Sequence, residues 1–189
     1  MLAAKLTEYS GRRDVIVLAL PRGGVPVGFE IAAALGAWLD PFLIRKLPVP
    51  ENEELEMGAI STGGATVLDA EVISYLQISA SAVDSIVGRE RVELDRRWTD
   101  YCGQRRAHGL REKTVILSDD GFASVWFLGA AVKALQQLEA KHIIIVAPIM
   151  SRWVVDAICP LVGCLHVDAV PIEIETSGDS ARLPQQLLG

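Results

Sequence analysis

Three short aliphatic runs, rich in β-branched residues, recur along this chain of 189 residues and limit the folds open to it. They are Val15–Leu20, Thr114–Leu117 and Ile143–Val146. Uninterrupted apolar runs of this length are typical of strands that are buried on both faces of a parallel sheet. Segments with helical spacing separate the runs, so the sequence predicts an α/β domain.

The first run leads into a predicted helix over Gly23–Leu35. Apolar residues four positions apart give this helix one buried face, and Gly36 is a suitable residue to end it. A second strand is predicted at Pro41–Lys46 and a weaker one at Leu165–Val170, with further helices near 126–139 and 151–160. The predicted architecture is a single domain with a mostly parallel, five-stranded sheet flanked by helices.

The middle of the chain has a different character. Prolines and an acidic cluster make 47–57 a poor helix or strand, and we interpret it as a mobile, solvated loop. Residues 58–68, around a Gly-Gly pair, resemble a short hairpin. Ser81 and Asp84 fit a capping box that begins a long, charged helix reaching to about Trp98.

These patterns divide the domain into a core and an insert. The core is predicted over about 12–60 and 112–172, the insert over about 61–111, and a polar C-terminal tail over about 173–189.

Charge and composition exclude several classes of function. The chain has 18 Lys and Arg residues against 24 Asp and Glu, a net charge of −6, which disfavours nucleic acid and anionic membrane as partners. No uncharged apolar stretch reaches the length of about 20 residues that a membrane helix needs, and the N-terminus lacks the pattern of a signal peptide. Three cysteines without a CxxC motif indicate thiols rather than disulfides or a zinc site, so we expect a cytoplasmic protein.

Ligands of parallel α/β sheets bind beyond the carboxyl ends of the strands, so the residues that follow each strand are candidates. The first strand is followed by Pro21 and then by Arg22, Gly23 and Gly24. Two glycines allow a ligand to approach backbone N–H groups at a helix N-terminus, and the arginine offers two parallel donors. This segment suits a diphosphate, although a plain Gly-rich turn with a solvated arginine would have the same sequence.

Two adjacent carboxylates, Asp119 and Asp120, follow the strand at Thr114–Leu117, and Gly121 directly after them is counted among the candidate substrate-binding residues. Carboxylates at the end of a buried strand are costly unless a cation or hydroxyl group meets them, so the pair suits a sugar diol or a ligand-bound Mg²⁺. The alternative is structural, with Asp120 capping the next helix while Asp119 faces water.

Arg45 and Lys46 close the predicted second strand and offer two cations near the same cleft. Successive side chains of a strand point to opposite faces, so at most one of them is expected to reach a ligand. We count both among the candidate substrate-binding residues.

In combination, these segments resemble the type I phosphoribosyltransferases and, among them, a bacterial group of stand-alone phosphoribosyltransferase-like proteins. The likeness covers roughly residues 3–150, and the combination is more specific than any one motif. The segments that carry it are Val17–Val27, Leu43–Leu47, Met57–Ile60 and Thr114–Gly121.

The resemblance implies an Mg²⁺-dependent transfer of 5-phosphoribose from phosphoribosyl pyrophosphate to a nitrogen nucleophile, with release of pyrophosphate. It implies that Arg22, Gly23 and Gly24 bind pyrophosphate and that Asp119 and Asp120 hold the ribose hydroxyls, with the metal at the same pair directly or through ligand and water. It further implies a mobile loop around 47–60, a small hood that shapes the acceptor pocket and, as is common for such domains, a homodimer.

The chain departs from the family where the 5′-phosphate should bind. The family has a Thr-Gly-small-Thr type of loop after the acidic pair, whereas this chain has Ser124, Val125, Trp126 and Phe127. Ser124 keeps a hydroxyl and is the expected phosphate contact, but Val125 replaces a glycine and the two aromatic residues are bulky. The sequence therefore predicts a phosphoribosyltransferase-like enzyme, with a non-catalytic protein of the same fold, acting in ligand binding, regulation or assembly, as the alternative.

Overall fold

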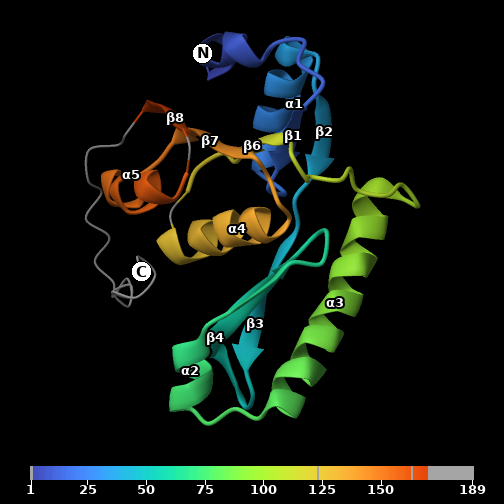
Figure 1. Ribbon diagram of the computed structural model, residues 1–189, viewed down its shortest axis with the longest axis vertical. Helices are drawn as coiled ribbons and strands as arrows, with labels where there is room; N and C mark the ends of the chain where they lie inside the picture. The colour runs from blue at the N-terminus through green and yellow to red at the C-terminus, as the bar shows by residue number, and fades with distance from the viewer. Residues whose placement is uncertain (1, 123, 163, 170–189) are drawn as a thin grey trace.

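The predicted aliphatic runs form the centre of a five-stranded parallel sheet in the computed structural model, in the order β2-β1-β6-β7-β8 (Figure 1). The structure describes residues 2–122, 124–162 and 164–169, the last six by their backbone. The α/β class and the five-stranded parallel sheet predicted from the sequence are confirmed. The strands are β1 (Val15–Ala19), β2 (Trp38–Pro41), β6 (Thr114–Ser118), β7 (His142–Ile149) and β8 (Cys164–Ala169).

Alternate residues of each central strand belong to two different cores. Val15 and Val17 pack with α1 (Gly24–Leu35) and with the N-terminal 3-10 helix η1 (Leu2–Tyr9). Ile16 and Leu18 pack on the other face. That second face is covered by α4 (Val125–Gln137) and α5 (Arg152–Ile158), followed by the short 3-10 helix η2 (Cys159–Leu161). Because helices cover both faces, the central residues of β1, β6 and β7 are apolar on both faces of the sheet.

A second, antiparallel sheet extends away from the parallel sheet and lies against the long helix α3 (Figure 1). Its strand order is β3-β4-β5, and its apolar core is separate from the two cores of the main sheet. We call this sheet and the helices beside it the hood. Its elements are β3 (Ile44–Val49), β4 (Asn52–Ser61), β5 (Thr66–Leu68), α2 (Ala70–Tyr75) and α3 (Ala80–Cys102).

The single strand predicted at Pro41–Lys46 is wrong, because the chain changes sheets within it. The Phe42 N–H donates to the carbonyl of Ala19 in the main sheet at 2.8 Å. The next N–H, of Leu43, donates to Oγ1 of Thr62 in the hood at 3.0 Å. Both residues are buried, so the apolar pattern continues while the pairing partner changes.

The loop predicted over 47–57 is also wrong, because β3 and β4 form a hairpin there with its turn at 50–51. Pro48 is tolerated because β3 is an edge strand, and the register of the ladder shifts on either side of it. The hairpin predicted over 58–68 is confirmed by the antiparallel pairing of β4 and β5.

The predicted helices are present with small changes at their ends. Gly36 ends α1 in the left-handed conformation, with φ of 65°. The cap of α3 is Ser79, whose side chain accepts from the N–H of Ala82, rather than Ser81 as predicted. The predicted tail over 173–189, and Val170 at the end of the predicted last strand, lie outside the described residues.

A buried carboxylate ties the segment that follows α3 to the edge of the main sheet. Asp40, on β2, is 1% exposed. Its Oδ1 lies 2.6 Å from Nη2 of Arg105, and its Oδ2 accepts from the backbone N–H of His108 at 2.9 Å and lies 2.8 Å from Nδ1 of that ring. The ring packs on Trp38, with centroids 4.9 Å apart. These contacts fix one end of the hood on the parallel sheet.

Within the described residues, no helix combines the length and hydropathy that crossing a bilayer would require. Cys102 and Cys159 are free thiols.

Candidate functional site

The turn between β1 and α1 packs closely against the end of β6. The Leu20 N–H donates to the carbonyl of Ser118 at 3.0 Å, and the Gly24 N–H donates back to Leu20 at 2.9 Å. A Cβ on Gly24 would lie 2.4 Å from the Ser118 carbonyl oxygen. That distance is far below van der Waals contact, so only glycine fits here. The Pro21–Arg22 peptide bond is cis.

The neighbouring glycine of the turn meets the acidic pair. A Cβ on Gly23 would lie 2.1 Å from the Asp120 carboxyl carbon. Asp119 also lies against the turn, because its Cα is 3.0 Å from the position that a Cβ on Gly24 would take. The structure therefore brings together two predicted segments that are almost a hundred residues apart in the sequence.

Asp119 has an unusual protonation equilibrium. Its partial burial, reinforced by the negative charge of Asp120, raises the pKa of the Asp119 carboxyl from 3.8 to about 6. Hydrogen bonding to the backbone of Asp120 opposes this rise without cancelling it. A cation or a hydroxyl donor at this place would favour the ionised carboxylate.

The segment after the acidic pair leads into α4. Ser124 caps this helix by accepting from the Phe127 N–H at 3.2 Å, so the predicted structural alternative for Asp120, a helix cap, is wrong. Val125 is 4% exposed and packs in the core of the main sheet. Gly121, another predicted site residue, follows the pair directly, and a Cβ there would lie 3.3 Å from the carbonyl oxygen of Ile149.

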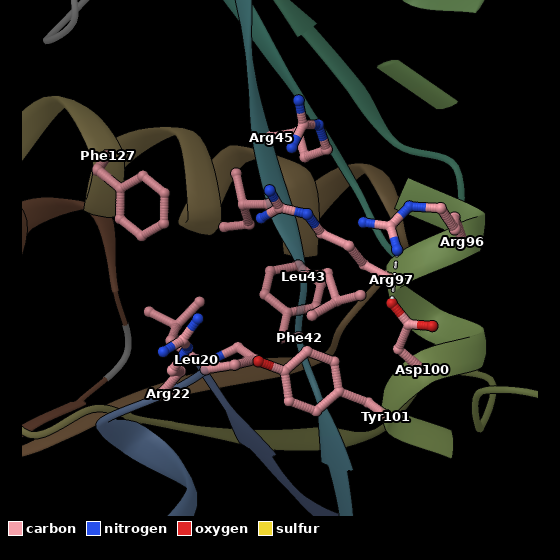
Figure 2. A pocket seen from close by; sticks show the side chains of 12 residues that line it. Leu20, Arg22, Phe42, Leu43, Arg45, Arg96, Arg97, Asp100, Tyr101 and Phe127 are labelled. Atoms are coloured by element: carbon pink, nitrogen blue, oxygen red, sulfur yellow. Dashed lines mark hydrogen bonds and ion pairs between the residues drawn. The ribbon is translucent and has the colours of Figure 1, made fainter. Parts of the chain in front are cut away.

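A cavity of about 400 Å³ lies between the end of β1, the start of β3 and helix α3 (Figure 2). Among the described residues that line it are the predicted Arg22 and Arg45, but not Asp119, Asp120 or Lys46. The turn thus contacts two different places. Its Arg22 lines the cavity, and its two glycines lie against the acidic pair. The lining consists of Leu20, Pro21, Arg22, Phe42, Leu43, Ile44, Arg45, Arg96, Arg97, Asp100, Tyr101 and Phe127.

The two cations predicted from the second strand have different surroundings. Arg45 lines the cavity and pairs with the buried Glu90 of α3, with 2.6 Å between Nε and Oε2. Lys46 pairs with Glu56 of β4 and lies over the Trp126 ring, 5.7 Å from its centroid. Glu56 is therefore not part of a solvated acidic loop, as the sequence suggested.

Helix α3 supplies cavity residues that the sequence reasoning missed. Arg97 and Tyr101 are four residues apart and so share one face of the helix. Glu93 accepts from Nε of both Arg96 and Arg97, at 2.7 and 2.9 Å, and these hydrogen bonds lower the pKa of its carboxyl to about 2. The signal in the sequence was an arginine and a tyrosine at helical spacing on a helix that was expected to be merely solvated.

No group of three or more His, Cys, Asp and Glu side chains among the described residues is arranged to hold a metal ion. The two adjacent carboxylates supply oxygen ligands of the kind that Mg²⁺ prefers, and they leave room for ligand or water oxygens to complete its shell. The donor set thus fits a metal that arrives with its ligand.

No family model matches the chain. Two proteins of Mycobacterium tuberculosis, from strains CDC 1551 and H37Rv, each named "Putative phosphoribosyl transferase", are 40% identical to it over 141 residues. That match covers 75% of this chain, which spans 31% of the length of those relatives. The crystal structure of TT1426 from Thermus thermophilus is similar, with a TM-score of 0.74 and 31% identity over 90% of this chain and 80% of that one.

Proposed function

Because the chain belongs to the phosphoribosyltransferase family, we propose that it transfers 5-phosphoribose from phosphoribosyl pyrophosphate to a nitrogen nucleophile. The observation that carries this proposal is the contact between the glycine turn and the acidic pair, where a Cβ on Gly23 would fall 2.1 Å from the Asp120 carboxyl carbon. Because the turn and the carboxylates are in contact, one ligand could place its diphosphate on the turn and its sugar hydroxyls on the carboxylates, as phosphoribosyl pyrophosphate would.

Arg22 has the role of holding the leaving group. Its side chain forms no hydrogen bond or ion pair with any described residue, so the guanidinium is available for two parallel hydrogen bonds to a phosphate. In the reaction, the acceptor nitrogen forms a bond to C1 of the ribose, and the bond from C1 to the pyrophosphate oxygen breaks. The bonding pair leaves with pyrophosphate, and an N–H acceptor releases its proton to solvent. Positive charge beside the departing oxygens lowers the barrier.

The acidic pair has the role of orienting the sugar. Asp119 and Asp120 accept hydrogen bonds from ribose hydroxyls in their ionised form, which a bound cation would favour further. Mg²⁺, when bound with the ligand, supplies charge neutralisation for the pyrophosphate.

The first turn of α4 is the candidate seat of the 5′-phosphate. N–H groups at a helix start attract anions, and those of Val125 and Trp126 have no partner among the described residues. The Ser124 hydroxyl accepts from Phe127 as a cap and still has a proton to donate. Trp126 and Phe127 are bulky residues in this turn, where the family has small or hydroxylated ones, so we expect weak phosphate binding.

The test is calorimetric titration of phosphoribosyl pyrophosphate with and without Mg²⁺, together with pyrophosphate and ribose 5-phosphate. Mg²⁺-dependent binding that the variant Asp119→Asn/Asp120→Asn loses, while its unfolding transition stays cooperative and is no weaker than that of the parent, would support the proposal. Normal binding by that variant would mean that the carboxylates are structural and that the ligand lies elsewhere.

A non-catalytic binding protein is the second candidate, and the substituted phosphate loop favours it. Val125 is buried in the core and thus fixes the backbone where the family has a glycine. The variant Phe127→Thr distinguishes the two candidates. If the phosphate site is functional and only obstructed by the Phe127 side chain, this variant should bind ribose 5-phosphate more tightly than the parent. Absence of binding to all three ligands, in the parent and in this variant, would favour the non-catalytic protein.

A further inference from the structure

The polar side chains that line the cavity are mostly hydrogen-bond donors. Four of them are arginines, and the other two are Asp100 and Tyr101. Arginine donates hydrogen bonds and never accepts them. A neutral ring that presents both donors and acceptors would therefore find few acceptors on these side chains, whereas an anion would find many donors.

Internal ion pairs account for most, but not all, of these donors. Arg45 is held by Glu90, and Arg96 by Glu93 and Asp100. Arg97 also pairs with Glu93, so the charges of these three arginines are balanced by three carboxylates. Arg22 has no acidic partner among the described residues. The cavity carries a net positive charge before any ligand enters.

Among the cavity arginines of the hood, Arg97 has terminal N–H donors that are available for a ligand. Its Nε donates to Glu93 at 2.9 Å, and neither of its two terminal nitrogens has a partner among the described residues. Figure 2 shows this side chain extending from α3 into the cavity, while Arg22 enters from the end of β1. The two side chains therefore offer two separate anion contacts in one cavity.

The rest of the lining suits a flat ring. Phe127 faces the cavity from α4, and Tyr101 points into it from α3 (Figure 2). Aromatic side chains of this kind bind planar rings by stacking or by edge-to-face contact. The cavity thus combines an aromatic lining with a guanidinium on the hood, that of Arg97, whose two terminal nitrogens have no partner among the described residues.

We propose that the acceptor of this protein is acidic, a nitrogen heterocycle that bears a carboxylate, and that Arg97 selects it through that carboxylate. This inference rests on the proposed function, in which Arg22 binds pyrophosphate and leaves Arg97 as the cation for the second ligand. The planar fork of a guanidinium matches a carboxylate through two parallel hydrogen bonds.

The test compares two planar ligands of nearly the same shape, one with a carboxylate and one with a neutral carboxamide in its place. Pyridine-3-carboxylate and pyridine-3-carboxamide are titrated into the full chain by calorimetry, with and without saturating Mg²⁺ and phosphoribosyl pyrophosphate. We expect the carboxylate to bind about 10- to 100-fold more tightly than the amide, the range that a charge-assisted hydrogen bond supplies. The variant Arg97→Gln should lose this preference.

The matched control is Arg91→Gln, because Arg91 lies on the same helix, is exposed and does not line the cavity. It should keep the preference of the parent protein. Equal binding of the two pyridines, no binding of either, or a preference that survives Arg97→Gln would overturn the inference. Binding of phosphoribosyl pyrophosphate is read separately in the same titrations, so its loss would refute the proposed function, whereas its presence without a carboxylate preference would refute only the acidic acceptor.

Discussion

The replacement Asp119→Asn is expected to stabilise the ligand-free protein at pH 8 and to change its stability little at pH 4. Burial raises the pKa of this carboxyl from 3.8 to about 6, so the folded state favours the protonated form. The resulting penalty on folding is absent below pH 3.8, grows between pH 3.8 and 6, and is constant above pH 6. Asparagine keeps the size of the side chain and removes the charge that is penalised.

The size of the gain follows from the shift. A rise of about two pKa units corresponds to about 3 kcal/mol for a fully desolvated charge. Asp119 is only partly buried, and screening by solvent reduces the expected gain at pH 8 to about 1 to 1.5 kcal/mol. At pH 4 the carboxyl is mostly protonated in the folded protein and partly so in the unfolded chain, which leaves a gain of about 0.3 kcal/mol.

Urea denaturation at the two pH values, followed by tryptophan fluorescence, measures this difference. The matched control is Asp84→Asn, which makes the same change at an exposed position on α3. The reasoning is refuted if Asp119→Asn destabilises the protein at pH 8, or if its effect is the same at both pH values. Either result would mean that the site solvates the ionised carboxylate well.

Three further predictions test the surroundings of the site. Gly24→Ala should cost about 2 kcal/mol or more, because its Cβ would meet a backbone oxygen, whereas Gly88→Ala, where the Cβ meets open space on α3, should stabilise by up to about 1 kcal/mol in the same urea titration. Below pH 6 the affinity for Mg²⁺ and phosphoribosyl pyrophosphate should decrease, by up to about tenfold per pH unit, because the Asp119 carboxyl gains its proton. Calorimetric pH profiles that are parallel for the parent and for Asp119→Asn would contradict this. Asp40→Ala should lower stability by about 2 to 3 kcal/mol, because its two partners lose a buried acceptor, and an unchanged melting temperature would show that this contact contributes nothing.

The sequence predicted the central strands of the main sheet, and the candidate residues that follow them, because those features are local. A β-branched run marks a strand wherever its neighbours lie, and the glycines and carboxylates follow such runs directly. The change of sheet between Phe42 and Leu43 was not predictable in this way, because both residues are apolar and buried and only their pairing partners differ. Alternation within a strand does not say to which sheet the strand belongs.

The contribution of α3 to the cavity was missed for a related reason. Arg97 and Tyr101 lie on a helix whose composition indicates an exposed, ion-paired surface. Most residues of this helix are indeed exposed in the structure. Their proximity to the end of β1 depends on how the hood sits on the parallel sheet, with Asp40 among the contacts that hold it there. No periodicity within the helix encodes that placement.

The contact between the first βα unit and the end of β6 also has a consequence for folding, because it joins parts of the chain that are far apart in sequence. The Ser118 hydroxyl donates to the carbonyl of Leu18 across 100 residues of sequence, and the whole hood lies in the stretch between them. Closing so long a loop is slow compared with forming a helix or a hairpin. A ligand that needs both the turn and the carboxylates will therefore bind only after β1 and β6 have paired, so the recovery of binding in a refolding experiment would time that pairing.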